Sequence, residues 1–279
     1  MIKIVSDSSS DIFNYPDVDY AVVPLKVRTS KKEYVDTGTD EVLDMCEFLA
    51  THNEKTSTSC PNAHEWLEAF NKDDDNICFT ISSNLSGSFN SCLQAKQIFE
   101  EEYGHKVAII DSFSAGSELK LLIDKAAELI KQGKTIDEIE KEVDAYSNTT
   151  HVYFYTPSVN NLANNGRIPS LVSKAISVLK ISLVGMGSYE GRIKMIHESR
   201  TPKKAIDFII DKMIERGYKG GKVIADGCDN VTLYQYLETK IKEKFPEAQV
   251  EYHETGILCS YYVEHKGIII AFEGAQEHE

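Results

Sequence analysis

The sequence lacks the features that mark membrane-spanning and disulfide-stabilised proteins. Its 279 residues contain no uncharged apolar run approaching the roughly 18–20 residues that a transmembrane helix needs. The first residues lack the basic segment and the longer apolar segment of a signal peptide. The six cysteines are scattered without a CxxC pair, which favours free thiols over a disulfide framework or a zinc site. We therefore expect a cytoplasmic protein with no transmembrane segment.

Basic residues are also in deficit. Thirty Lys and Arg residues stand against 44 Asp and Glu residues, which gives a formal net charge of −14. Binding to a nucleic acid backbone requires clustered basic side chains, and so does docking on an anionic membrane. The composition therefore argues against both kinds of partner. It leaves room for a small anionic ligand, because a few local donors can hold one.

Strand and helix patterns alternate in the first half of the chain. Five runs rich in β-branched or aromatic residues predict strands at residues 1–7, 20–27, 75–83, 106–112 and 151–157. Between them, Asn62 with Glu65 and Thr135 with Glu138 have the spacing of helix capping boxes. This alternation predicts a mostly parallel sheet with helices on both faces.

The second half has a different pattern and predicts a mixed α/β domain. Thr201 followed by Pro202 is typical of a helix start. The other expected elements are an amphipathic helix at residues 168–180, a hairpin around Gly185–Gly191, a helix at about 232–244, and strands at 222–227, 249–254 and 267–274. We place a domain boundary near Ser147–Thr150. The fold class is then two-domain α/β, with an N-terminal domain at residues 1–148 and a C-terminal domain at residues 149–279.

Hydroxyl-rich clusters follow several of the predicted strands. They lie at residues 6–9, 81–88 and 111–116, and a separate loop at residues 56–62 carries another. One such cluster is usually a helix cap, but the carboxyl ends of parallel strands meet at one edge of a sheet. Together the clusters predict a site of neutral donors that suits a carboxylate or phosphate. The expected contact is Ser86, followed by Gly87, which allows close backbone approach.

Six motifs in this order resemble the DegV family over nearly the whole chain. They are IVSDSSSDI, VVPLKV with Tyr34 and Asp36 after it, TSCPN from Thr58, ISSNLSGSFNSC, IIDSFSAG and NNLANNGRI. The resemblance implies a two-domain α/β fold that buries one long-chain fatty acid between its domains. It also implies a possible partner, because some members present the lipid to a separate ATP-dependent kinase subunit that makes the acyl phosphate.

The resemblance further implies the site residues. Thr58 and Ser86 would donate hydrogen bonds to the carboxylate, since hydroxyls and one backbone N–H can satisfy it. Arg200 matches an arginine linked to partner function. The full set expected at the ligand is Thr58, Ser59, Ser86, Gly87, Ser88, Arg167 near the head group, and Tyr262. No catalytic residue, metal or cofactor is implied beyond the bound fatty acid.

The chain departs from the family pattern at a few positions. The usual carboxylate-binding histidine falls on Tyr262, which donates one hydrogen bond but does not become cationic near neutral pH. His253 or His265 could replace that histidine. Asn165 stands in place of a glycine and Ile181 in place of a proline. These departures concern the phosphotransfer role more than lipid binding.

Two other functions stay open at this point. One is a regulatory or partner-binding protein with a different small anionic ligand. The other is a serine hydrolase with Ser86 as nucleophile. A hydrolase requires a general base beside the nucleophile, and the sequence contains no Gly-x-Ser-x-Gly elbow and no paired His/Asp pattern. The expectation is therefore a lipid-binding protein rather than an enzyme.

Overall fold

The computed structural model describes residues 1–52, 54–169 and 182–276. The helix expected at residues 168–180 lies outside these ranges except for its first two residues, and Ile181 also lies outside them.

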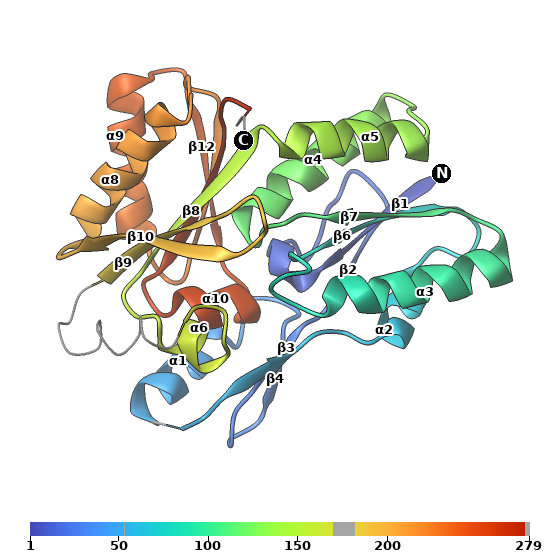
Figure 1. The fold of residues 1–279 in the computed structure, drawn as a ribbon, viewed down its shortest axis with the longest axis horizontal. Coiled ribbons are helices and arrows are strands. Elements are labelled where there is room, and N and C mark those ends of the chain that lie inside the picture. The colour runs from blue at the N-terminus through green and yellow to red at the C-terminus, as the bar shows by residue number, and fades with distance from the viewer. Residues whose placement is uncertain (53, 170–181, 277–279) are drawn as a thin grey trace.

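The first part of the chain forms a four-stranded parallel sheet between two layers of helices (Figure 1). Alternate residues of its strands face opposite layers. Ile4 and Ile77 pack with α4 and α5, whereas their neighbours Val5 and Cys78 pack with α2 and α3. The predicted parallel sheet is confirmed. The strands, in spatial order, are β2 (Tyr20–Val23), β1 (Ile2–Asp7), β6 (Asp75–Thr80) and β7 (Val107–Asp111), and the helices are α2 (Ala63–Ala69), α3 (Ser88–Tyr103), α4 (Ser117–Lys131) and α5 (Ile136–Ser147).

The single strand predicted at residues 20–27 is wrong. The run divides into β2 and β3 (Lys26–Arg28), which belong to different sheets. Pro24 lies between them and has no N–H to continue a ladder. β3 pairs antiparallel with β4 (Glu33–Val35) and β5 (Ser57–Ser59) in a small three-stranded sheet. The segment predicted as a hydroxyl-rich loop at residues 56–62 is therefore partly a strand.

The second part forms a six-stranded mixed sheet. Only β11 and β12 pair in parallel, and the other neighbours are antiparallel. The expected hairpin is confirmed as β9 and β10. Helices α8 (Pro202–Glu215) and α9 (Val231–Lys244) cover the outer face (Figure 1). The strands, in spatial order, are β10 (Ile193–Ser199), β9 (Ser182–Gly187), β8 (Thr150–Thr156), β13 (Ile268–Glu273), β11 (Lys222–Gly227) and β12 (Gln249–Glu254).

Three short helices fill the space between the six-stranded sheet and the first part of the chain. They are α1 (Val42–Thr51), α6 (Asn160–Asn164) and α10 (Ile257–Val263) (Figure 1). α10 contacts α1, α6, β3 and β8. One hydrophobic cluster joins residues from both parts, among them Val27 on β3 and Phe154 on β8. The α10 helix thus links the two parts, and so does α4, which contacts β8, β11 and β13.

The predicted helix starts are confirmed. The Asn62 side chain accepts from the Glu65 amide at 3.1 Å, and the Glu65 carboxylate accepts from the Asn62 amide at 2.8 Å. Thr135 and Glu138 form the same reciprocal pair. Thr201 caps α8. These bonds satisfy backbone donors that the first helical turn leaves free.

Buried carboxylates from the first part hold the start of α10. Asp11 accepts from the Gly256 amide at 2.8 Å, and Asp36 accepts from the Ile257 amide at 2.6 Å. A Cβ at Gly256 would lie 2.5 Å from the Asp36 carboxylate, so this close approach requires glycine. Nearby, Lys120 on α4 forms an ion pair with Asp226 on β11 at 2.7 Å, with side chains 5% and 0% exposed.

Asp36 is expected to make the protein less stable as the pH rises from about 4 to 7. Burial raises the pKa of Asp36 from 3.8 to about 7, so over this range the folded state holds a proton that the unfolded chain has lost. The free energy of unfolding should fall by up to about 1.4 kcal/mol per pH unit from this residue. Urea unfolding of wild type and Asp36→Asn at several pH values measures this, and an identical slope in the two proteins would contradict it.

Candidate ligand-binding site

Thr58 meets Tyr262 at the contact between the two parts of the chain. Thr58 lies on β5, opposite Val27 of β3, and Tyr262 lies on α10. Their hydroxyl oxygens are 2.8 Å apart. Burial raises the pKa of the Tyr262 hydroxyl, so this group stays neutral and available as a donor. The segment around Tyr262 is a helix and not a strand, so the helical period sets the direction of the Tyr262 side chain.

The loop that carries Ser86 and Gly87 is fixed at both ends by one buried carboxylate. Asp7 accepts from the Ile81 amide at 2.9 Å and from the Ser88 hydroxyl at 2.6 Å. Burial raises the pKa of Asp7. Between these points the Ser86 amide donates to the Ser82 carbonyl at 3.1 Å. The hydrogen bonds to Asp7 and to the Ser82 carbonyl therefore fix the conformation of this loop.

Thr58, Ser59, Ser86, Gly87, Arg167 and Tyr262 line one polar pocket with an empty volume of about 570 Å³, part of it open to solvent. The Ser59 hydroxyl is buried and has no hydrogen-bond partner among the described residues. Buried polar groups are normally paired, so this unpaired hydroxyl is an unusual feature beside the pocket. The other lining residues are Leu25, Cys60, Ile81, Leu85 and Leu258.

Ser88 is set apart from the other expected residues. Its hydroxyl donates to Asp7, and it does not line the polar pocket. Its position at the first turn of α3 gives it a structural role below the loop. Gly87 does lie in the wall, and a Cβ there would lie 3.1 Å from the Cys60 sulfur. A larger residue at this position would therefore require the Cys60 side chain to shift by a few tenths of an ångström.

Arg167 is held at the edge of the pocket by backbone carbonyls. Its Nε donates to the Leu85 carbonyl at 3.0 Å, and a second guanidinium nitrogen donates to the Asn165 carbonyl. Asn165 itself donates to the Tyr261 hydroxyl at 2.8 Å and has a φ of −98°. The next residue, Gly166, has a φ of 72°. Only the second position thus needs glycine, which explains why asparagine fits the first.

Neither alternative histidine lines this pocket. His265 is about half exposed and lies 3.0 Å from the Asp229 carboxylate. His253 lies on the outermost strand β12, where burial lowers its pKa. Arg200 is exposed just after β10 and also lies away from the pocket. Tyr262 is therefore the residue that contacts Thr58.

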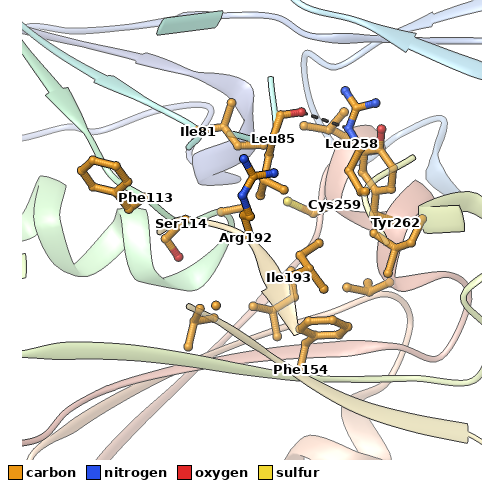
Figure 2. Close-up of a pocket in the computed structure, with 18 residues that line it drawn as sticks. Ile81, Leu85, Phe113, Ser114, Phe154, Arg192, Ile193, Leu258, Cys259 and Tyr262 are labelled. Atoms are coloured by element: carbon orange, nitrogen blue, oxygen red, sulfur yellow. Dashed lines mark hydrogen bonds between the residues drawn. The ribbon is translucent and has the colours of Figure 1, made fainter. Parts of the chain in front are cut away.

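An apolar cavity adjoins the polar pocket. The two share five wall residues: Ile81, Leu85, Arg167, Leu258 and Tyr262. The apolar cavity has an empty volume of about 730 Å³, part of it open to solvent. Figure 2 shows Phe113 and Ser114 on one side of it and Leu258, Cys259 and Tyr262 on the other, with Phe154 at its base. Its remaining wall residues are Ala115, Val152, Leu162, Gly187, Gly191, Arg192, Ile193, Val263 and Ile269.

Sequence reasoning identified the polar end better than the apolar wall. Val152 and Phe154 face the cavity, whereas Tyr153 and Tyr155 pack in the core on the opposite face of the sheet. All four were equally plausible wall residues from their type, and only the two-residue period of a strand separates them. Phe113, with a φ of 49°, was not singled out at all. Apolar walls carry the same residue types as an ordinary core.

The described residues include no group of three or more His, Cys, Asp or Glu side chains arranged to hold a metal ion. Within the same ranges, no helix combines the length and apolarity needed to cross a membrane.

The fold and the site define an α/β protein, built on a parallel sheet, a mixed sheet and a small antiparallel sheet, whose apolar cavity adjoins a hydroxyl-lined pocket. This arrangement matches an elongated molecule with a polar end. The sequence model of the DegV family matches residues 1–273, and the chain belongs to this family. The resemblance noted from the six motifs is therefore confirmed.

Individual relatives agree with this assignment. A DegV domain-containing protein of Streptococcus pneumoniae is 32% identical over 97% of this chain and 98% of its own length. The structure of a DegV family protein from Eubacterium eligens loaded with heptadecanoic acid has a TM-score of 0.94 and 33% identity, and covers 99% of this chain and 100% of the other. The Streptococcus pneumoniae Fatty Acid Kinase (Fak) B3 protein loaded with linoleic acid has a TM-score of 0.93 and 32% identity, with the same coverage.

Proposed function

We propose that this protein binds one long-chain fatty acid between two domains, residues 1–148 and 149–279. The carboxylate is held by the hydroxyls of Thr58 and Ser86 and the backbone of Gly87, and the acyl chain fills the apolar cavity. The observation that carries the proposal is the junction of the two spaces, which share Leu85, Leu258 and three other wall residues. A fatty acid has the same division into a polar end and an apolar chain.

The donors at the polar end support a carboxylate ligand. Ser59 adds an unpaired buried hydroxyl, and Tyr262 adds a neutral phenol within reach of Thr58. Hydrogen bonds to an ionised acceptor are stronger than neutral ones, so several hydroxyls compensate for the loss of hydration. Arg167 lies in the same wall and offers positive charge nearby.

We further propose that the protein presents its fatty acid to a separate ATP-dependent kinase subunit in the cytoplasm and carries no cofactor of its own. The similarity to the Fak B3 protein supports this role. Arg200 is exposed after β10 and is available for contact with such a partner.

A serine hydrolase is less well supported. Within the described ranges, the Ser86 hydroxyl accepts a hydrogen bond from the Ser88 amide at 3.3 Å, and no imidazole or carboxylate forms a hydrogen bond with it. A serine nucleophile needs such a base to remove its proton. Labelling with a fluorophosphonate is therefore expected to fail.

The proposed function is tested by native mass spectrometry of the purified protein, followed by organic extraction of the bound molecule. We expect one fatty acid per chain. A protein that is empty and takes up no added fatty acid of any length would overturn the proposal.

Filling the apolar cavity should shift the preference of the protein toward fatty acids with shorter chains. Ala115 lines this cavity, so Ala115→Trp places an indole where the acyl chain is expected. We expect affinity for a C18 acid to fall by about tenfold or more, because several methylenes worth about 0.8 kcal/mol each lose their place. Octanoic acid should be affected less. Displacement of a fluorescent fatty acid measures both, with Leu43→Trp at an exposed site of α1 as control. Equal losses for both acids would contradict the assignment of the cavity.

A further inference from the structure

Two cysteines from distant parts of the sequence lie beside each other in the core. Cys46 is on α1, and Cys228 directly follows β11. Their sulfur atoms are 3.7 Å apart, although 182 positions separate the residues in sequence. A disulfide bond is about 2.05 Å long, so bond formation requires the sulfurs to approach by less than about 2 Å.

The surroundings of the pair favour a thiolate on Cys228. Hydrogen bonds from Cys46, from Ser260 and from the Lys266 amide lower the pKa of Cys228. The same contact raises the pKa of Cys46, which therefore keeps its proton. Both side chains are buried, with Cys228 0% and Cys46 7% exposed, so an oxidant must reach them by local opening of the core. The thiolate is the reactive form of cysteine, so Cys228 is the member of the pair that then attacks first.

The pair lies in the hydrophobic cluster that also forms the wall of the apolar cavity. Phe154, Cys259 and Val263 belong to both. The backbone of Cys228 is bonded to the segment after α10, with its amide donating to the Gly267 carbonyl at 3.0 Å. On the other side, α1 contacts α10. A disulfide would join α1, which contacts α10, to Cys228, which is bonded to the segment after α10. It would therefore restrain the chain on both sides of the helix that carries Tyr262.

We propose that Cys46 and Cys228 form a peroxide-sensitive modification site whose disulfide slows exchange of the bound ligand. The effect on exchange rests on the proposed fatty acid binding, whereas disulfide formation does not. The Cys228 thiolate attacks hydrogen peroxide, an S–O bond forms, the O–O bond breaks, and hydroxide leaves and takes up the proton that the Cys228 thiol had released, which gives the first water. The Cys46 sulfur then attacks the sulfenic acid, the S–S bond forms, the S–O bond breaks, and the second water leaves. Two thiols are oxidised and one peroxide is reduced.

The remaining thiols differ from this pair in position. Cys78 and Cys92 are both buried in one cluster of the first part of the chain, so a disulfide between them would not join the two parts of the chain. Cys259 is buried and its thiol donates to the Ser9 carbonyl at 3.5 Å. Cys60 is partly exposed in the wall of the polar pocket. The extent of Cys60 oxidation therefore serves as an internal control for how much oxidant has reached the protein.

The chemical step is tested on the intact chain with hydrogen peroxide, followed by denaturation, alkylation and mass spectrometry. We expect a cross-linked peptide that contains Cys46 and Cys228 and is released by dithiothreitol. Cys46→Ser and Cys228→Ser should each abolish it, whereas Cys92→Ser should not. Oxidation of Cys60 while Cys46 and Cys228 remain free thiols would overturn the proposal.

The effect on the ligand is measured as the release rate of a preloaded fluorescent fatty acid into excess albumin. A disulfide restricts the local opening of the segments that it joins, so release should slow by about tenfold or more and recover with dithiothreitol. Cys228→Ser should show no response to peroxide. A disulfide that forms without changing the release rate would overturn the link to ligand exchange. A wild-type protein that forms the disulfide but never takes up the fatty acid would instead refute the proposed function.

Discussion

The double variant Thr58→Val, Ser86→Ala is expected to bind a long-chain fatty acid about a hundredfold or more weakly than wild type. Each hydroxyl is expected to donate to the ionised carboxylate, and a hydrogen bond to a charged group contributes about 1.5–3 kcal/mol. Both side chains line the polar pocket. The two substitutions remove donors while keeping most of the side-chain volume, so the apolar cavity should be unaffected.

Isothermal titration with delipidated protein measures this loss. Ser83→Ala is the matched control, because Ser83 lies on the same loop but does not line the polar pocket. The methyl ester of the same fatty acid provides a second comparison, since it lacks the charge and should distinguish wild type from the double variant only weakly. Wild-type affinity in the double variant would remove Thr58 and Ser86 from the head-group site.

Lys120→Met is expected to lower the free energy of unfolding by about 3–5 kcal/mol, because it leaves a buried charge without a partner. Asp226 is 0% exposed and pairs with Lys120 at 2.7 Å. Its second carboxylate oxygen has no partner among the described residues. Burial also raises the pKa of Asp11, and the positive charge of Lys120 opposes that rise. Loss of Lys120 therefore disfavours two buried carboxylates at once.

Urea unfolding of three variants tests this prediction. Lys222→Met is the control, because the pair of Lys222 with Asp124 is partly exposed and such pairs contribute about 0–1 kcal/mol. The double variant Lys120→Met, Asp226→Leu should recover much of the lost stability, since replacing both buried ions by apolar groups is often neutral. A small loss in Lys120→Met, similar to that of Lys222→Met, would contradict the role of this ion pair.

The sequence predicted the elements whose signals are local. Capping at Asn62 and Thr135 depends on residues three positions apart, and the parallel strands of the first sheet alternate with helices in a regular way. The run at residues 20–27 failed because Pro24 sends its two halves into different sheets. Apolar composition alone does not indicate that the two halves of the run pair with strands of different sheets.

Contacts between distant segments were the main features that local patterns did not contain. The meeting of Thr58 with Tyr262 was implied by resemblance to the family, and no periodicity in the chain indicates it. The ion pair of Lys120 with Asp226 joins residues 106 positions apart and was not foreseen. Ser88 was expected at the ligand because it follows Ser86 and Gly87 in sequence. As the first residue of α3, it donates its hydroxyl to Asp7 instead.

Under the proposed function, the contact between Thr58 and Tyr262 also couples ligand occupancy to the folding equilibrium. One hydroxyl comes from β5 and the other from α10, so neither part of the chain contains the whole of the proposed head-group site. A ligand held by both binds the folded state and not the unfolded chain. A free ligand concentration of about a hundred times the dissociation constant then adds about 2.7 kcal/mol to the free energy of unfolding. The melting temperature of a given preparation will consequently report its lipid load as well as its sequence.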